Sequence, residues 1–173
     1  MQIPEDMAII LGNGSDELIQ MLALTFTGKE RVLLAPEPSF VMYRLLAQVM
    51  GMQYVGVPLD EDNFNLDAFA MLEAIETYEP ALIFLAYPNN PTGNAFEIED
   101  IESVLEIASG VLVIDEAYAP FTNYTWLSRL GEYPNLLVMR TVSKLGLAGL
   151  RLGLLVGAPN WLEQIDKTRL PYN

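Results

Sequence analysis

The sequence predicts an α/β fold of three layers, in which helices cover both faces of a mainly parallel sheet. Short apolar runs rich in Leu, Ile and Val alternate along the chain with longer segments of helical character. No repeat, low-complexity tract or internal linker interrupts this alternation. Strands that are buried on both faces read as nearly continuous hydrophobic runs, so the alternation favours parallel strands joined by helical crossovers.

The elements follow one another in a regular order. In chain order, the apolar runs that we expect to be strands are residues 8–11, 31–35, 53–57, 81–86, 111–114, 136–139 and 152–156. The helical segments that separate or follow them are residues 16–25, 40–50, 66–77, 98–108 and 159–168. In sheets of this kind ligands bind outside the carboxyl ends of the strands, so residues that directly follow a strand are the first candidates for a site.

Composition excludes several classes of function. The chain has 173 residues, of which 51% are hydrophobic and 18% charged, which indicates a globular domain with a substantial core. No apolar run is long enough for a membrane span, and the first ten residues do not resemble a signal peptide. Without cysteine there is no disulfide framework, which favours the cytoplasm. Without histidine, Ser-His-Asp and Cys-His catalysis are excluded, and only carboxylates remain for a metal site.

The charge distribution points to one local anion site. A formal net charge of −14 argues against binding to nucleic acid or to an anionic membrane surface. Yet Arg140, Lys144 and Arg151 lie close together in MRTVSKLGLAGLRLG, whereas no Lys or Arg occurs between Arg44 and Arg129. Because the overall field repels anions, any anion bound here must be held by local contacts.

Two loops after expected strands contain possible ligand donors. In LGNGSDELI, Gly14 lets the backbone approach a ligand, and the helix that begins at Ser15 or Asp16 offers free N–H groups to a phosphate. The alternative is a tight turn with a helix cap, and Glu17 breaks the dinucleotide-binding pattern G-x-G-x-x-G. In YPNNPTGN, Asn90 offers an amide at a strand end, although a plain turn explains the loop equally well.

Two further loops supply charged groups. VLVIDEAYAPF ends a buried strand at Asp115, whose carboxylate needs a cation or a metal as partner, and Tyr118 is close enough to share the site. A magnesium-binding Walker B strand is the rival, but the sequence has no G-x-x-x-x-G-K-[ST] loop. In the basic segment, we expect desolvation to lower the pKa of Lys144 and so to favour amine chemistry.

The basic segment also completes a phosphate site. Arg151 can bind a phosphate with both arms of its guanidinium, and Thr141 and Ser143 are hydroxyl donors. The alternative is a loop whose basic side chains reach solvent. Taken together, the loops suit a ligand with a phosphate, a cationic ring nitrogen for Asp115 and a carbonyl for Lys144. Pyridoxal 5′-phosphate is such a ligand, since it forms a Schiff base with a lysine and needs an acidic partner for its pyridinium nitrogen.

The chain resembles the fold-type I pyridoxal-phosphate aminotransferases of class II, and within them the histidinol-phosphate branch. Five segments carry the resemblance in order: GNGSDELI, PSFVMY, YPNNPTG, DEAYAPF and RTVSKLGLAGLRLG. The fold implied is the large domain of these enzymes. The resemblance implies that Lys144 forms the Schiff base and moves the proton, and that Asp115 pairs with the pyridinium nitrogen.

The resemblance also implies roles for the other candidates. Asn90 and Tyr118 would bind the phenolic oxygen of the cofactor, and Phe40 would stack on its ring unless it only packs in the core. The residues implied to bind the phosphate are Gly14, Ser15, Asp16, Thr141, Ser143 and Arg151.

The implied reaction transfers an amino group between L-histidinol phosphate and 2-oxoglutarate in a ping-pong cycle, and the implied full-length protein is a homodimer. Members of the family also have an N-terminal segment and a C-terminal small domain, so we expect residues 1–173 to be the cofactor-binding large domain alone, with little or no activity. Three alternatives stay open. One is another class II aminotransferase or a threonine-phosphate decarboxylase, the second a non-catalytic cofactor-binding domain, and the third a nucleotide-binding module.

Overall fold

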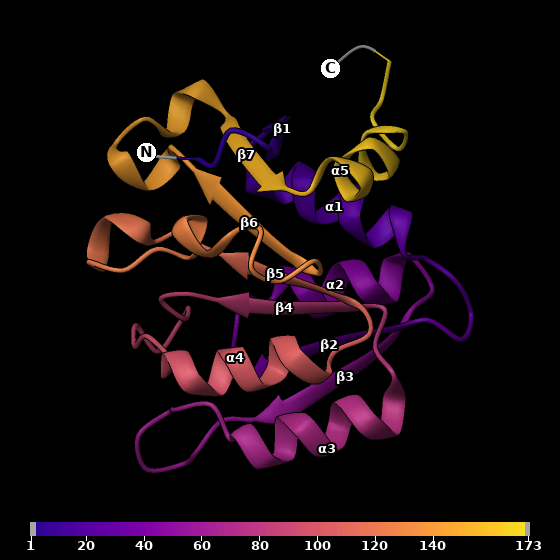
Figure 1. The fold of residues 1–173 in the computed structure, drawn as a ribbon, viewed down its shortest axis with the longest axis vertical. Coiled ribbons are helices and arrows are strands. Elements are labelled where there is room, and N and C mark those ends of the chain that lie inside the picture. Colours follow the sequence, from indigo (N-terminus) through magenta and orange to yellow (C-terminus); the bar gives the residue numbers. More distant parts are fainter. Residues whose placement is uncertain (1–2, 172–173) are drawn as a thin grey trace.

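The computed structural model describes residues 3–171, which form a seven-stranded sheet with helices on both faces (Figure 1). The strands are β1 (Ala8–Asn13), β2 (Val32–Glu37), β3 (Gln53–Pro58), β4 (Leu82–Ala86), β5 (Val111–Asp115), β6 (Leu136–Thr141) and β7 (Leu152–Gly157). The helices are α1 (Ser15–Thr25), α2 (Met42–Val49), α3 (Ala68–Tyr78), α4 (Ile98–Ile107) and α5 (Pro159–Asp166). Every expected strand and helix is present, with small differences at the ends.

The sheet is mainly parallel, as the sequence predicted. Its strand order is β1-β7-β6-β5-β4-β2-β3, and only β7 runs antiparallel to its two neighbours, β1 and β6. The chain between β6 and β7 contains only two 3₁₀ turns, η3 (Ser143–Leu145) and η4 (Ala148–Leu150). Because a parallel neighbour would require a crossover of a dozen or more residues, this shorter connection makes β7 antiparallel.

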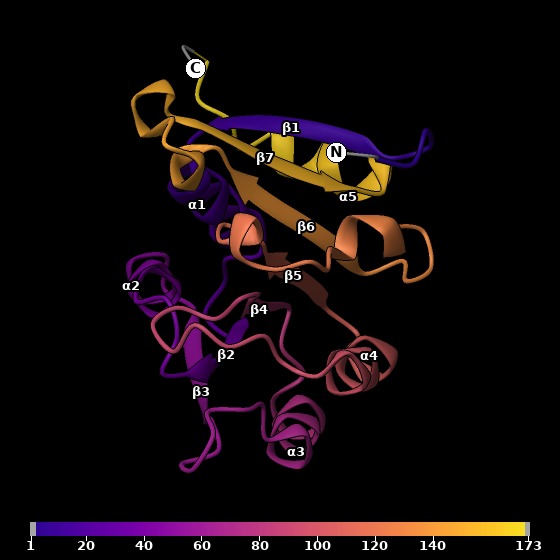
Figure 2. The ribbon, with the colours of Figure 1, turned by 90° about the vertical axis from the view of Figure 1, so that its left-hand side faces the viewer.

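Two apolar layers hold the helices to the sheet. Helices α3 and α4 pack on one face, where Ile83 and Leu85 of β4 point, and α1 and α2 pack on the other face with Leu82 and Phe84 (Figure 2). Helix α5 packs on the same face as α1. The central strands β4 and β5 are therefore buried along their whole length, which explains their continuous hydrophobic sequences. Among the described residues, no helix combines the length and apolarity needed to cross a membrane.

Local capping explains one difference between the expected and the observed boundaries. The hydrophobic pattern predicted a helix from Leu66, but the carboxylate of Asp67 accepts a hydrogen bond from the backbone N–H of Ala70 at 3.0 Å. A side chain in this position satisfies a free N–H group of the first turn, so the helix begins at Ala68, two residues later than predicted.

The loops of interest meet at one edge of the sheet. Strands β1, β4, β5 and β6 all end there, and β7 begins there because it runs in the opposite direction. The register places Asn13 of β1 opposite Leu152 of β7, and Asp115 of β5 between Ala86 of β4 and Met139 of β6. Segments far apart in the sequence therefore contribute side chains to the same place.

Candidate functional site

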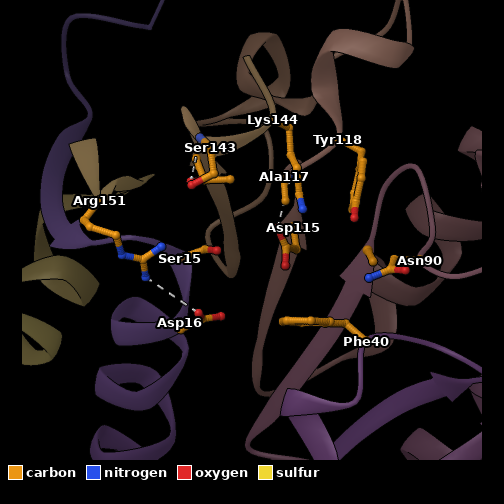
Figure 3. A pocket seen from close by; sticks show the side chains of 12 residues that line it. Ser15, Asp16, Phe40, Asn90, Asp115, Ala117, Tyr118, Ser143, Lys144 and Arg151 are labelled. Atoms are coloured by element: carbon orange, nitrogen blue, oxygen red, sulfur yellow. Dashed lines mark hydrogen bonds and ion pairs between the residues drawn. The ribbon is translucent and has the colours of Figure 1, made fainter. Parts of the chain in front are cut away.

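A pocket lies at this edge of the sheet (Figure 3). The side chains of Lys144, Tyr118, Asn90 and Phe40 point into the same space, and Arg151 reaches toward it from the opposite side. Every residue that the sequence predicted for cofactor binding lines the pocket, with the exception of Gly14. The full lining is Ser15, Asp16, Phe40, Ala86, Asn90, Asp115, Ala117, Tyr118, Thr141, Ser143, Lys144 and Arg151.

One end of the pocket has the donors that an anion requires. The amino end of α1 begins at Ser15, so its free backbone N–H groups and the positive end of the helix dipole are available. The hydroxyls of Thr141 and Ser143 lie 3.0 Å apart, and Nη2 of Arg151 lies 3.9 Å from Oδ2 of Asp16. This set of a helix terminus, hydroxyls and a guanidinium suits a phosphate group.

Glycine is required where the loops of this anion end approach one another. Gly14 has φ of +83°, and a Cβ atom there would lie 2.7 Å from Nη2 of Arg151. A Cβ atom on Gly153 would lie 2.6 Å from the backbone of Gly14. Gly14 does not line the pocket itself, but its lack of a side chain brings Arg151 against the start of α1. The anion end of the pocket therefore depends on two glycines, Gly14 and Gly153.

Asp115 is the buried acid of the pocket. Its side chain comes from the end of β5, and the residue is 4% exposed. The hydroxyl of Tyr43 donates a hydrogen bond to Oδ2 at 2.8 Å, and the N–H of Ala117 donates to Oδ1 at 3.0 Å. Burial raises the pKa of Asp115 to about 6, and these two hydrogen bonds oppose the rise because they favour the ionised form.

The described residues supply no cationic partner for Asp115, so the cation or metal expected from its sequence stays a prediction. Its two hydrogen-bond partners are neutral donors, and the described residues contain no group of three or more His, Cys, Asp or Glu that could hold a metal ion. The neutral donors satisfy the two oxygens without neutralising the charge. A cation that enters the pocket would therefore be favoured next to this carboxylate.

Lys144 lies in the 3₁₀ turn η3 and faces the pocket. Its Nζ is 4.9 Å from the centre of the Tyr118 ring, at the distance of a cation–π contact. The side chain is exposed, in contrast to the desolvated environment that the sequence predicted. The reason is that the whole segment from Lys144 to Arg151 lies at the surface, so solvent reaches the amine.

The two adjacent asparagines after β4 have different tasks. Asn89 is buried, and its amide donates to the carbonyl of Pro38 at 3.0 Å and to the hydroxyl of Thr92 at 2.8 Å. Asn90 lines the pocket and points into it, near Tyr118 (Figure 3). The first residue therefore fixes the loop, and the second presents an amide to a ligand.

Phe40 forms another wall of the pocket, and it is half-buried at the border of the core, against which it packs. Its ring meets that of Tyr43 edge to face, with centres 5.6 Å apart and an angle of 85° between the planes. An aromatic wall of this kind can stack on a flat ligand. The position therefore suits the stacking role that the resemblance implied.

Sequence reasoning missed three residues that shape the site. Tyr43 was not singled out, because a tyrosine in an amphipathic helix gives no sign of the strand that it will contact. Ala86 and Ala117 line the pocket, but alanine carries no chemical signal. Arg140, which lies close to Lys144 and Arg151 in the sequence, does not line the pocket, and its guanidinium forms an ion pair with the buried Glu116.

Comparison with known proteins agrees with this geometry. Residues 1–173 match the family model described as aminotransferase class I and II. The chain is 55% identical over 173 residues to "Histidinol-phosphate aminotransferase 2" of Nitrosococcus oceani, covering 100% of this chain and 48% of that protein. It is 51% identical over 171 residues to "Histidinol-phosphate aminotransferase" of Neisseria meningitidis, covering 99% and 47%.

Solved structures give the same result. The histidinol-phosphate aminotransferase from Clostridium acetobutylicum superposes with a TM-score of 0.87 at 26% identity, over 98% of this chain and 51% of that one. The histidinol-phosphate aminotransferase from Sinorhizobium meliloti, solved in complex with pyridoxal-5′-phosphate, superposes with a TM-score of 0.82 at 26% identity, over 93% of this chain and 45% of that one. The chain thus spans about half the length of the curated relatives it matches.

Proposed function

The chain belongs to the aminotransferase class I and II family, and on this premise we propose that it is the pyridoxal 5′-phosphate-binding part of an aminotransferase. One observation carries the proposal: a single pocket contains a lysine amine, a buried carboxylate and, at its anion end, the donors that suit a phosphate. A primary amine, an acid and a phosphate site are what this cofactor requires of its protein. When bound, pyridoxal phosphate withdraws electrons from the α-carbon of an amino substrate, which makes the proton on that carbon acidic.

The residues present fit the cofactor at each of its functional groups. Lys144 would bind the carbonyl carbon through its amine, and after the substrate amine has displaced it from that carbon, its free Nζ would accept and return the substrate proton. Asp115 would hold a proton on the ring nitrogen, because residues 3–171 give its buried carboxylate two neutral donors and no cation. Asn90 and Tyr118 would orient the phenolic oxygen.

The remaining lining residues would hold and cover the cofactor. Phe40 would stack on the ring and exclude water from that face. The phosphate would lie at the amino end of α1, against the backbone of Gly14, Ser15 and Asp16 and the side chains of Thr141, Ser143 and Arg151.

We propose L-histidinol phosphate as amino donor and 2-oxoglutarate as acceptor for the whole protein, in histidine biosynthesis. The support is that the curated relatives named above are histidinol-phosphate aminotransferases at 55% and 51% identity. A cytoplasmic location and a homodimer of the full-length protein are further parts of the proposal. Another amino-acid aminotransferase is the alternative, because the pocket described here serves the cofactor and not the substrate side chain.

The test is to add pyridoxal 5′-phosphate, follow the visible absorbance band, reduce with borohydride and locate the labelled lysine by peptide mapping. Label on Lys144 is expected, with none on Lys29, which is exposed and outside the pocket, or on Lys167, which donates to Gln164 at 2.7 Å. The Lys144→Ala variant should lose the band, and the matched Lys29→Ala variant should keep it. Label spread evenly over all three lysines would contradict the proposal.

A second assay separates an enzyme from a binding domain. Amino transfer from L-histidinol phosphate to 2-oxoglutarate is measured for this chain and for a full-length relative. Cofactor binding without turnover would identify the 173-residue chain as a cofactor-binding unit whose reaction needs the other half of the protein. Turnover at the rate of the full-length relative would show that this half contains the whole machinery.

A further inference from the structure

Tyr43 lies behind the wall of the pocket and contacts two residues that line it. The residue is 0% exposed and is not itself part of the lining. Its hydroxyl donates to Oδ2 of Asp115 at 2.8 Å, and its ring meets Phe40 edge to face. The ring also stacks on Phe84 of β4, with centres 4.5 Å apart and planes 5° from parallel. A single residue of α2 therefore touches both the acid and the aromatic wall.

The hydrogen bonds to Asp115 fix the plane of its carboxylate. Tyr43 holds Oδ2, and the backbone N–H of Ala117, two residues after the strand, holds Oδ1 at 3.0 Å. Rotation about the Cβ–Cγ bond would break both contacts and leave buried polar groups unpaired, which is costly. The Tyr43 ring is fully buried and packs against Phe40 and Phe84, so its movement with such a rotation would disturb this packing.

Burial and the neighbouring carboxylates act against the ionised form of Asp115, and its two hydrogen bonds favour it. Burial has the largest effect and raises its pKa, and the carboxylates of Asp16 on α1 and of Glu116 next to it raise it further. The hydrogen bonds from Tyr43 and Ala117 lower it. Burial and the charge of Asp115 in turn raise the pKa of the Tyr43 hydroxyl well above its ordinary value, so this group stays protonated and donates. Lys144 lines the same pocket, on an exposed segment.

We propose that Tyr43 is a positioning residue, which orients the Asp115 carboxylate and favours its ionised form so that it can hold a cationic ring nitrogen. This inference rests on the proposed function for the identity of the ring. The contact between Tyr43 and Asp115 belongs to the protein alone, so it can be tested without cofactor. The variant Tyr43→Phe removes only the hydroxyl and keeps the ring that packs against Phe40 and Phe84.

The first measurement is an NMR titration of the Asp115 carboxyl carbon in the cofactor-free chain. The pKa should rise by about one to two units in Tyr43→Phe, because a hydrogen bond to a charged group has been lost. Tyr87→Phe is the matched control: Tyr87 is 3% exposed, packs against Tyr124 and Trp126, and does not line the pocket. It should leave the titration unchanged. An unchanged pKa in Tyr43→Phe would overturn the inference.

The second measurement compares two ligands, pyridoxal 5′-phosphate and its analogue with carbon in place of the ring nitrogen. Tyr43→Phe should lower the affinity for pyridoxal phosphate about tenfold, because one pKa unit corresponds to one tenfold step in an equilibrium constant. It should leave the affinity for the analogue unchanged. Equal weakening of both ligands would mean that the hydroxyl only supports packing, which contradicts the inference. In an Asp115→Asn background, Tyr43→Phe should cause no further loss.

The two measurements also separate failure of this inference from failure of the proposed function. If the unmodified chain binds neither ligand, the proposed function fails for this chain, and the titration alone decides whether Tyr43 controls the carboxylate. If the chain binds pyridoxal phosphate but Tyr43→Phe alters neither the titration nor the affinity, the proposed function stands and the inference is wrong.

Discussion

The ion pair of Glu116 and Arg140 gives the sharpest test of the forces that hold the site together. The Glu116 side chain is 0% exposed and that of Arg140 is 21% exposed. Nε and Nη2 of Arg140 lie 2.7 and 2.6 Å from Oε2 of Glu116. Glu116 also accepts from the hydroxyl of Thr125 at 3.0 Å and from the backbone N–H of Trp126 at 2.6 Å. The pair ties the ends of β5 and β6 together next to the pocket.

The substitution Arg140→Met keeps an unbranched side chain and removes the guanidinium with its charge. Glu116 would then be a buried carboxylate with two hydrogen bonds and no cation. Removing one partner of a buried pair costs about 3 to 5 kcal/mol, and the partial exposure of Arg140 places the expected loss near about 3 kcal/mol. This is a large part of the roughly 5 to 15 kcal/mol that stabilises an ordinary domain.

The assay is urea unfolding at pH 7, followed by the fluorescence of the two tryptophans, of which Trp126 is fully buried. With a slope of about 2 kcal/mol per molar urea, the midpoint should fall by about 1.5 M. The double variant Glu116→Gln with Arg140→Met should recover most of the loss, because no charge is left buried. Arg44→Met is the control and should shift the midpoint far less, because the side chains of its ion pair are exposed to solvent, Arg44 to 50% and Glu37 to 34%. A loss below about 1 kcal/mol in Arg140→Met, or a double variant as unstable as the single one, would refute the reasoning.

Three further predictions concern single residues of the site. Burial raises the pKa of Asp115 from 3.8 to about 6, so its ionisation destabilises the fold as the pH rises through this window. Asp115→Asn should therefore raise the free energy of unfolding of the cofactor-free chain at pH 7, by at most about 3 kcal/mol, and should not raise it at pH 3. Urea unfolding at the two pH values measures the difference. Gly14→Ala should lower the affinity for pyridoxal phosphate more than that for pyridoxal, because the new Cβ displaces Arg151 from the anion end. Equal losses of affinity for the two ligands in binding titrations would contradict this. Gly153→Ala should lower the melting temperature by several degrees, because its Cβ would clash with the backbone of Gly14, and an unchanged melting curve would show that the loops can separate freely.

The sequence was sufficient for the fold class because the sheet is buried on both faces. A strand such as β5, VLVID, must be apolar at every position but its end, and the helices between strands show the longer apolar period. Loops after strands could be selected as site candidates for the same reason, since parallel strands end at one edge. Asp115, Lys144 and Arg151 were identified in this way and do line one pocket.

What the sequence alone did not reveal are the contacts between side chains of distant segments. Tyr43 and Asp115 are 72 positions apart, and nothing in either local pattern predicts that one donates to the other. The exposure of Lys144 was also mispredicted, because small and apolar neighbours in the sequence do not bury a side chain when the whole segment lies at the surface. Burial depends on which elements pack over a residue, and that is a property of the assembled layers.

The sequence by itself therefore determined the alternation of strands and helices, the edge of the sheet at which the candidate pocket lies and the chemical types of the groups there. Periodicity, turn residues and the scarcity of positive charge are local properties that can be read one segment at a time. Only the tertiary structure decided that Arg140 pairs with Glu116 and not with an anion, and that neutral donors hold Asp115. The reason is that hydrogen bonds and ion pairs form at about 3 Å, and such proximity between remote residues is set by the register and packing of the sheet.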